Sequence, residues 1–268
     1  MFLSKWTALG NHFLLVERDV LPFELSSARA RILCDPATGL GADGVLELWS
    51  PDDADVAVRV WNRDGSVAEV SGNGTRIAVA FAAERLGLHE LSVLTDAGLG
   101  RARVLDDGRI AVTMGTAALS GPQYAPFGEA PGPAHAFVSI GNPHMVLDVD
   151  DLAGYPLETE GPRLEHHAWF PERTNVEAIR VLDRHRLELR VWERGVGETQ
   201  ACGSGAVASA VAAVSSGRCA SPVSVEMPGG QVEVEVEVDL SVSLIGTAER
   251  LYGAELDPAL VARLAAAA

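Results

Sequence analysis

The sequence repeats itself at a spacing of 131 residues, and this repetition constrains the fold more than any other feature. Four short stretches recur in the same order: LGN and IGN at 9 and 140, VWNR and VWER at 60 and 191, SGNG and CGSG at 71 and 202, and MGTA and IGTA at 114 and 245. Chance could supply one such match, whereas four at a single spacing indicate an internal duplication. We therefore expect two half-domains of the same architecture.

The repeat also sets the expected domain boundaries. The N-terminal half-domain covers residues 1–117 together with the C-terminal tail at about 249–268, and the C-terminal half-domain covers residues 118–248. The stretch GPQYAPFGEAPGPAH at 121–135 is rich in Pro and Gly, as is typical of a linker. The chain has 268 residues, of which 47% are hydrophobic, so it is long enough for two packed cores.

Each half is expected to be rich in strands, with one or two helices. The predicted helices lie at 24–34, 73–86 and 203–216, and the last is apolar nearly all round, so it should be buried. The alternation of apolar and polar residues over 231–244 predicts a half-buried strand, and RIAVTM at 109–114 ends at the equivalent point of the first copy. In the tail, Asp257 as N-cap and Pro258 as first residue predict a helix.

Composition excludes several classes of partner. The formal net charge is −16, from 37 acidic and 21 basic residues, and a surface of this charge repels the phosphates of nucleic acids and anionic membranes. No stretch approaches the 18 apolar residues of a transmembrane helix, and the N-terminus lacks a signal-peptide pattern. We therefore expect a protein that binds neither nucleic acid nor membrane.

The three cysteines indicate a reducing compartment. Cys34, Cys202 and Cys219 are an odd number in a chain too large to need disulfides, which favours reduced thiols and a cytoplasmic location. Their spacing does not match a zinc site, and the histidines form no HExxH motif, so no metal is expected. Cys34 and Cys219 are interpreted as structural residues.

The paired glycine turns are the strongest candidates for chemistry. Ser71 and Cys202 each precede a Gly-x-Gly turn and a predicted helix. The first turn of a helix offers unpaired N–H groups and a partial positive charge, which favour a thiolate and hold a carboxylate. The alternative interpretation is that Cys202 is a small buried hydrophobic residue. The duplication favours the chemical one, because two such positions on opposite faces of a carbon could remove a proton and return another.

Polar residues near the turns fit this interpretation. Glu193 and Arg194 precede Cys202, and Asn62 and Arg63 hold the same positions relative to Ser71. A carboxylate can serve as proton partner of a thiol, and an arginine can bind a carboxylate in bidentate fashion. The alternatives stay open: Glu193 and Arg194 as a solvated pair, and the asparagines Asn11, Asn142 and Asn175 as turn residues.

Several motifs together resemble the diaminopimelate epimerase family, whose members work without pyridoxal phosphate. They are ALGNHF at 8–13, GLGADG at 39–44, WNRDGS at 61–66, SGNGTR at 71–76, GNPHMV at 141–146, FPERTN at 170–175 and ERGVGETQACGSG at 193–205, and the last is the most specific. The resemblance covers nearly the whole chain. It implies an α/β (α+β) fold of two pseudo-two-fold half-domains, each a β-barrel-like sheet around a central helix, with the active site in the cleft between them.

The resemblance also implies roles for individual residues. Cys202 is implied as one acid/base residue, assisted by Glu193, and Ser71 takes the place of the other, assisted by His144. The implied substrate-binding residues are Asn11, Asn62, Gly72, Asn73, Asn142, Asn175, Glu193, Arg194, Gly203 and Ser204. No cofactor and no metal are implied, the partner is a small molecule, diaminopimelate, and the family suggests a homodimer.

Position 71 departs from the family pattern, which has cysteine there. A serine hydroxyl is far less acidic than a thiol and is a poor base for an α-carbon proton. Three explanations stay open: an engineered replacement, a natural enzyme with a Ser/Cys pair, or a paralogue with altered chemistry such as a one-base dehydratase or isomerase. His12, where the family usually has Asp, is interpreted as variation at the surface or behind the site.

The leading hypothesis is a cofactor-independent epimerase that interconverts LL- and meso-diaminopimelate, in lysine and peptidoglycan precursor biosynthesis, by two-base proton transfer. One alternative is a racemase, epimerase or isomerase of the same fold that acts on another amino acid. Another is a paralogue that binds an amino acid without turning it over.

Overall fold

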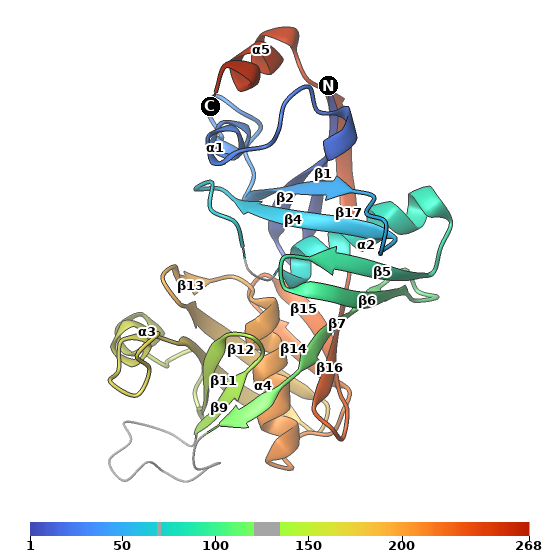
Figure 1. Cartoon of the computed structure of the whole chain (residues 1–268). Helices are drawn as coiled ribbons and strands as arrows, with labels where there is room; N and C mark the ends of the chain where they lie inside the picture. The colour runs from blue at the N-terminus through green and yellow to red at the C-terminus, as the bar shows by residue number, and fades with distance from the viewer. Residues whose placement is uncertain (69–70, 121–134, 268) are drawn as a thin grey trace. The chain divides into compact units, whose positions relative to one another are not determined.

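The computed structural model describes residues 1–68, 71–120 and 135–267, so the predicted linker lies outside the described residues except for its last position. The chain forms two compact units. Unit 1 comprises Met1–Val112 and Gly246–Ala268, and unit 2 comprises Thr113–Ile245. The units divide a few residues before the boundaries that the repeat suggests. Each unit is a mixed α/β structure (Figure 1).

Unit 1 is a sheet wrapped around one helix. Its strands are β1 (Phe2–Ala8), β2 (Asn11–Glu17), β3 (Gly44–Trp49), β4 (Val56–Asn62), β5 (Glu90–Thr95), β6 (Gly98–Val104), the start of β7 (Ile110–Thr116) and β17 (Glu249–Glu255). Its helices are η1 (Arg18–Val20), α1 (Ser27–Cys34), α2 (Gly72–Leu86) and α5 (Pro258–Ala266). Helix α2 contacts each strand from β1 to β6, so it is the central helix of this unit.

Unit 2 repeats this plan around α4. Its strands are β8 (Ala118–Ser120), β9 (His135–Ser139), β10 (Pro143–Asp148), β11 (Asn175–Asp183), β12 (Arg186–Glu193), β13 (Gly197–Thr199), β14 (Val223–Met227), β15 (Gly230–Val236) and β16 (Ser241–Gly246). Its helices are α3 (Leu157–Glu165) and α4 (Gly203–Ser215). Helix α4 contacts β9, β10, β11, β12, β14 and β15. The expectation of strands around a central helix is confirmed in each unit.

Strand register confirms the duplication. In unit 1 the parallel pair β2–β3 aligns Phe13 with Gly44, and in unit 2 the parallel pair β10–β11 aligns His144 with Asn175. The next, antiparallel pairs agree as well, because Val45 lies opposite Trp61 in β3–β4 and Val176 lies opposite Trp192 in β11–β12. All of these pairs are related by the spacing of the sequence repeat.

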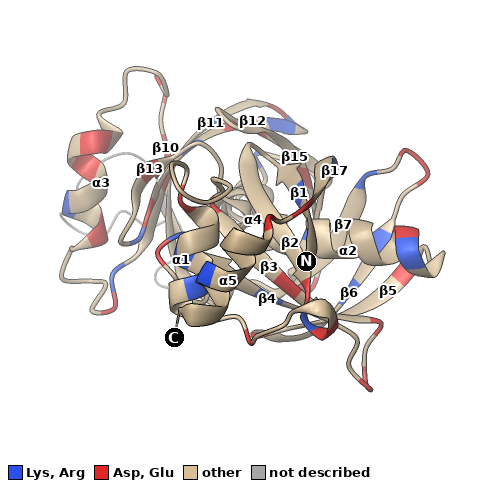
Figure 2. Ribbon diagram, turned by 90° about the horizontal axis from the view of Figure 1, so that it is seen from above, with Lys and Arg blue, Asp and Glu red and all other residues tan. Residues whose placement is uncertain are grey.

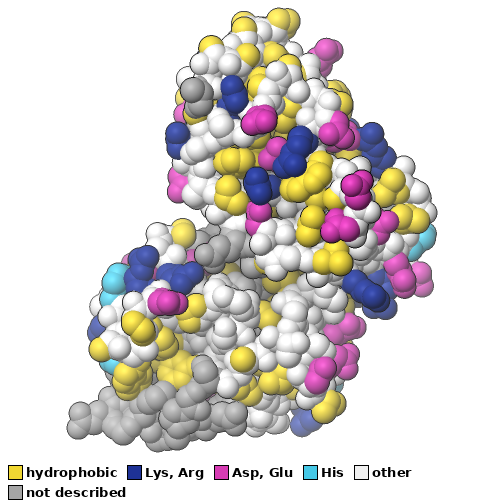
Figure 3. Space-filling model, in the orientation of Figure 1, with side chains coloured by type: hydrophobic (Ala, Val, Ile, Leu, Met, Phe, Trp, Pro, Cys, Tyr) yellow, Lys and Arg dark blue, Asp and Glu magenta, His cyan; other side chains and the backbone are white. Residues whose placement is uncertain are grey.

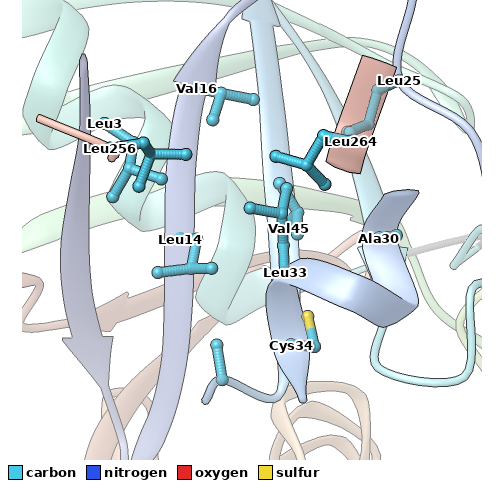
Figure 4. Packing of buried hydrophobic residues seen from close by; sticks show 11 residues of the cluster. Leu3, Leu14, Val16, Leu25, Ala30, Leu33, Cys34, Val45, Leu256 and Leu264 are labelled. Carbon is cyan, nitrogen blue, oxygen red and sulfur yellow. The ribbon is translucent and has the colours of Figure 1, made fainter. Parts of the chain in front are cut away.

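Each unit has a hydrophobic cluster of its own. In unit 1, β1, β2 and β3 pack against α1 and α5 through the residues shown in Figure 4, among them Leu3, Leu14, Leu33, Val45 and Leu264. The last of these comes from the C-terminal helix, so the tail belongs to this core. In unit 2 a second cluster joins β10 and β11 to α3, and its members include Met145, Leu147, Leu157, Leu164 and Val176. Burial of these side chains is the main favourable term in folding.

The predicted helices are confirmed with small changes of boundary. Ser26 caps α1, and Asp257 caps α5 by accepting a hydrogen bond from the backbone N–H of Ala259, with Pro258 as first residue. Helix α4 is buried over Gly205–Ala213, as its apolar sequence predicts. Helix α3 has no counterpart among the predictions. It contains Pro162, a residue that argues against helix in any reading of local pattern.

The prediction of one strand over 231–244 is wrong. The segment forms two antiparallel strands, β15 and β16, with a reversal between Val236 and Ser241. Leu240 adopts a left-handed conformation with φ of 64°, and the Asp239 side chain accepts hydrogen bonds from the backbone and hydroxyl of Ser241. Alternation continues through the turn, so the pattern of apolar residues does not reveal it.

The surface carries charges of both signs. Figure 2 shows Asp and Glu on loops and strand ends with Lys and Arg among them, and α3 carries both signs. On the face drawn in Figure 3, basic side chains of each unit lie beside acidic ones and apolar groups. Within the described residues, every helix is too short or too polar to cross a membrane.

Candidate active site

Ser71 and Cys202 occupy the same place at the start of the two central helices. Each is the N-cap residue and has an extended backbone. Its side chain accepts a hydrogen bond from the backbone N–H of the residue three positions later. The Gly74 N–H lies 3.1 Å from Ser71 Oγ, and the Gly205 N–H lies 3.4 Å from Cys202 Sγ. The hydroxyl and the thiol thus perform one structural task, which explains why the fold accepts either at this position.

The surroundings of Cys202 favour the thiol over the thiolate. Burial raises the pKa of Cys202 well above its ordinary value, and the nearby carboxylate of Glu193 raises it further. Hydrogen bonds from Ser204 and from the Gly205 N–H oppose this shift but do not outweigh it. The N–H group at the helix start thus favours the thiolate, as expected, but desolvation of the buried charge outweighs it in the ligand-free protein.

Slow alkylation of Cys202 follows from this shift. At pH 8 we expect Cys202 in the ligand-free protein to react with iodoacetamide about tenfold or more slowly than free cysteine, because the thiolate is the nucleophile. Mass spectrometry of quenched samples would follow the site, and the same protein in denaturant is the control. Reaction at the rate of free cysteine would contradict the raised pKa.

Glu193 is the carboxylate whose charge acts most strongly on Cys202. It ends β12 and is half-buried, and its Oε1 accepts a hydrogen bond of 2.5 Å from the Thr199 hydroxyl. Thr199 belongs to β13, which pairs with β12 and leads into the Cys202 turn. The hairpin thus fixes a carboxylate whose charge helps to raise the pKa of the Cys202 thiol.

The next residues of this hairpin are connected to β10 and β11. The Asn175 side chain accepts a hydrogen bond from the Arg194 backbone N–H at 2.9 Å and donates to the Pro143 carbonyl at 3.0 Å. Arg194 is half-buried, and its guanidinium donates to the Glu172 carbonyl. Asn175 therefore fixes the backbone at Arg194, and its predicted contact with substrate stays a prediction.

His144 lies in unit 2 in contact with two polar side chains. Its Nδ1 lies 2.7 Å from Glu177 Oε1, and its Nε2 lies 2.9 Å from Asn142 Oδ1. His144 and Glu177 are both fully buried as side chains. Burial raises the pKa of Glu177, although the adjacent histidine opposes this. The implied assistance of His144 to residue 71 stays a prediction.

In unit 1 the predicted residues Asn11 and Asn73 form one connected set with a buried arginine. Asn73 Nδ2 donates to Asn11 Oδ1 at 2.7 Å, and Arg76 Nη2 donates to Asn73 Oδ1 at 2.6 Å. Arg76 has no exposed surface, its Nε and Nη1 lack a partner among the described residues, and burial lowers its pKa to about 10.

The remaining predicted residues lie at the ends of the same elements. Asn62 ends β4 and donates from its side chain to the Ser66 hydroxyl at 3.0 Å. Gly72 and Gly203 are the first residues of α2 and α4, and Ser204 Oγ lies 3.5 Å from Cys202 Sγ. The side chain of His12 is exposed, in line with its interpretation as surface variation.

Sequence reasoning missed Glu177 and Arg76. A residue-by-residue comparison of the two copies contains the signal: Glu177 stands where the first copy has Leu46, and Arg76 stands where the second copy has Val207. A charged residue in a slot that its copy fills with an aliphatic side chain is a candidate for function, because burying charge is unfavourable.

The second glycine of each turn has little room for a side chain. A Cβ at Gly205 would lie 3.1 Å from Glu177 Oε1 and 3.4 Å from Cys202 Cβ. A Cβ at Gly74 would lie 3.0 Å from Leu46 Cδ2 and 3.1 Å from Ser71 Oγ. Both helix starts thus use glycine to let other side chains approach the N-cap residue.

Alanine at these glycines should be destabilising. We expect Gly205→Ala to lower the free energy of unfolding by about 1 kcal/mol, because overpacking of about 1–3 kcal/mol exceeds the gain of about 1 kcal/mol in helix propensity. Urea denaturation measures the change. Ser215→Ala, at the exposed end of α4, is the control and should be neutral or slightly stabilising. A stabilised Gly205→Ala protein would contradict the close packing.

Comparison with known proteins agrees with the fold and the residues described above. The sequence profile of the family described as Diaminopimelate epimerase matches residues 3–120 and 136–251. Diaminopimelate epimerase 1 of Nostoc sp. is 40% identical over 94% of this chain and 98% of its own length. The diaminopimelate epimerase of Pseudomonas fluorescens (strain Pf0-1) is 39% identical over 93% of this chain and 96% of its own.

Solved structures of lower identity share the fold. A phenazine biosynthesis protein of the PhzF family from Bacillus anthracis has a TM-score of 0.73 at 17% identity, covering 96% of this chain and 99% of that chain. A hydroxyproline epimerase from Agrobacterium vitis has a TM-score of 0.68 at 16% identity, covering 97% and 93%.

The fold with two repeated halves and the named relatives together define an isomerase. The match of family profile and relatives along nearly the whole chain then identifies the family. The chain belongs to the diaminopimelate epimerase family and is an epimerase of this fold.

Proposed function

We propose that this enzyme interconverts LL- and meso-diaminopimelate without a cofactor, by two-base proton transfer at the α-carbon, for lysine and peptidoglycan precursor synthesis. The observation that carries the proposal is the matched pair of helix starts. Ser71 Oγ and Cys202 Sγ hold the same N-cap position in the two copies, each with the N–H groups of a first helical turn beside it. Such N–H groups stabilise the negative charge that develops on a substrate carboxylate.

In this mechanism one residue removes the α-proton and the other returns a proton to the opposite face. Cys202 acts as the base in one direction, and its own proton first passes to Glu193, because the raised pKa keeps the thiol protonated at rest. Once formed, a thiolate of raised pKa is a strong base. Ser71, assisted by His144, serves as proton donor on the other face. Charge and proton count balance, since each inversion removes one proton and adds one.

Substrate recognition is assigned to polar groups at the strand and helix ends. Gly72, Asn73, Gly203 and Ser204 bind the reacting carboxylate through the helix starts, and Asn62, Asn142, Asn175, Glu193 and Arg194 bind the distal amino-acid end, with Asn11 lining the pocket. The relatives named diaminopimelate epimerase support diaminopimelate as the substrate. A racemase acting on another amino acid and a silent binding protein are the alternatives.

Serine at position 71 makes the two half-reactions unequal in this proposal. A hydroxyl donates a proton but is a poor base, so abstraction through Cys202 should be faster than abstraction through Ser71. The enzyme is therefore expected to exchange the α-hydrogen of one stereoisomer faster than it inverts either.

Hydrogen exchange with separated stereoisomers in deuterated water tests the proposal. We expect deuterium at the α-carbon of one diaminopimelate isomer, detected by mass spectrometry, with slow net inversion. An amino-acid panel run alongside reveals another substrate. If diaminopimelate binds but neither isomer exchanges, the silent binding protein is the better explanation.

We also propose a homodimer, and a reduced, cytoplasmic protein. Exposed apolar side chains on β1 and β17 support the dimer: Phe2, Leu251 and Tyr252 are 55%, 47% and 42% exposed. The three free cysteines support a reducing compartment. Sedimentation equilibrium tests the dimer, and Tyr252→Lys should weaken it; a monomer at all concentrations refutes it.

A further inference from the structure

Two equivalent asparagines are held in the same orientation by different partners. Asn11 and Asn142 are related by the sequence repeat. Asn11 Oδ1 accepts from Asn73 Nδ2 at 2.7 Å, and Asn142 Oδ1 lies 2.9 Å from His144 Nε2. Among the residues that the structure describes, neither Asn11 Nδ2 nor Asn142 Nδ2 has a hydrogen-bond partner. The Nδ2–H groups of both amides are thus available to donate hydrogen bonds to a ligand.

In unit 1 the orientation follows from the chemistry of arginine. A guanidinium only donates hydrogen bonds, so the atom of Asn73 that lies 2.6 Å from Arg76 Nη2 must be its oxygen. The nitrogen of Asn73 then donates, and the atom of Asn11 that receives it must be oxygen too. Arg76 therefore sets both amides, and Asn11 is left with its Nδ2 unpaired.

In unit 2 the same result needs a proton between Glu177 and His144. Nε2 must carry hydrogen to donate to Asn142 Oδ1, and the contact of 2.7 Å between Nδ1 and Glu177 Oε1 needs one more proton, on nitrogen or on oxygen. The pair then has no net charge. Complete burial, which raises the pKa of Glu177, favours this neutral pair over an isolated carboxylate.

The two copies serve as structural controls for each other. Arg76 corresponds to Val207, His144 to Phe13, and Glu177 to Leu46. The slots match in space as well, because Leu46 Cδ2 approaches Gly74 as Glu177 Oε1 approaches Gly205. Each slot is thus filled by an apolar residue in one copy, so the fold does not require the buried polar groups. Their presence points to a task beyond packing.

We propose that Arg76 and Glu177 are positioning residues that orient the amides of Asn11 and Asn142, so that each asparagine presents Nδ2–H donors to an oxygen-bearing group of the ligand, such as a carboxylate. Arg76 acts through Asn73, and Glu177 acts through His144. An ammonium group would not be bound by these donors, so the two arrangements select for oxygen acceptors at both asparagines.

The inference rests on the proposed function only in taking the amino-acid substrate as ligand. The orientation of the amides is a property of the free protein and can be measured without turnover. Failure of hydrogen exchange with diaminopimelate would refute the proposed function but not the orientation of Asn11 by Arg76 or of Asn142 by Glu177. We call these two arrangements the relays. A wrong protonation or amide orientation would sink the relays alone.

Substitutions that copy the other half test the relays. Arg76→Val imitates Val207, and Glu177→Leu imitates Leu46. For each we expect the dissociation constant of meso-diaminopimelate, measured by calorimetry, and its KM to rise about tenfold, the effect of one lost oriented hydrogen bond. For Arg76→Val we expect kcat to change less than threefold, since Asn11 touches no reacting atom. Glu177→Leu should lower kcat as well, because His144 assists Ser71 in the proposed mechanism. Unchanged affinity in both variants would overturn the proposal.

Conservative and control variants separate positioning from packing. Glu177→Gln can donate to Nδ1 and so keeps the proton on Nε2; its affinity should stay within about threefold of the parent. The double variant His144→Phe/Glu177→Leu reproduces the Phe13–Leu46 pair, should fold, and should bind as weakly as Glu177→Leu. Glu47→Gln removes a buried carboxyl bonded to Arg18 and Trp61, and should lower stability but not affinity.

Nitrogen-15 NMR measures the protonation of the His144 ring directly, beginning with the parent protein. Ring nitrogens of His144 that bear hydrogen differ clearly in chemical shift from bare ones. We expect a protonated Nε2 in the free protein and in Glu177→Gln, and loss of this state in Glu177→Leu. A bare Nε2 in the parent would mean that Asn142 turns its nitrogen toward the ring, and this would refute the relay in unit 2.

Discussion

Replacing Cys202 with alanine should lower deuterium exchange at the α-carbon of diaminopimelate by about 10³-fold, within the range of about 10²–10⁴ that a positioned base contributes. The reason is that Cys202 is the strong base of the pair in the proposed mechanism, and Ser71 cannot replace it. Binding of the substrate should persist, because Gly203, Ser204 and the N–H groups of α4 are unchanged. Calorimetry with meso-diaminopimelate and mass spectrometry of the exchanged product measure the two quantities separately.

The control for this experiment is Cys219→Ala. Cys219 is also a free, buried cysteine of unit 2, and among the described residues the only hydrogen-bond partner of its thiol is the Asp183 carbonyl. We expect a modest loss of stability and an unchanged exchange rate. Exchange that survives in the Cys202→Ala protein would show that another group is the base, and the assignment of Cys202 would have to be abandoned.

The second large effect is a gain. Ser71→Cys should raise the rate of net inversion by about 10²-fold or more, because a thiol near pH 8.5 titrates far closer to working pH than a hydroxyl does. The structure indicates that the substitution is tolerated, since Cys202 already holds the equivalent N-cap position in the second copy. Circular dichroism at the chirality-sensitive wavelengths of the substrate, or chiral chromatography, follows inversion directly.

A serine-to-cysteine change elsewhere provides the matched control. Ser216, the C-cap of α4, hydrogen-bonds to the Ala212 carbonyl and lies at the opposite end of that helix from Cys202. Ser216→Cys should leave inversion unchanged. If Ser71→Cys binds diaminopimelate but inverts it no faster than the parent, the chain is better described as a one-base enzyme or as a binding protein.

Local sequence signals account for much of the fold. The helix of the tail begins where Asp257 and Pro258 predict it, and α4 is buried as its apolar composition requires. The repeat predicts two copies of one architecture, and the matching registers of β2–β3 and β10–β11 confirm it. These features depend on residues a few positions apart, or on similarity between copies, and both can be read from the chain.

Other elements depend on contacts that no local pattern contains. Helix α3 forms despite Pro162, and its Leu157 and Leu164 are buried against β10 and β11. The alternation of apolar and polar residues continues through the turn between β15 and β16. Only the pairing of Val234 with Leu244 in the structure therefore reveals a hairpin. Tertiary packing decides both, because burial of apolar area outweighs the local preference.

The candidate site shows the same division. The sequence alone determined that there are two copies, that Ser71 and Cys202 hold equivalent positions before glycine turns, and that Asn11 recurs as Asn142 in the repeat. Only the tertiary structure decided that burial raises the pKa of the Cys202 thiol, and that Arg76 and Glu177 are buried with their amide and imidazole partners. The physical reason is that desolvation and hydrogen bonding depend on how many distant segments surround a group. The spacing of residues along the chain does not show how many segments surround a group in the folded protein.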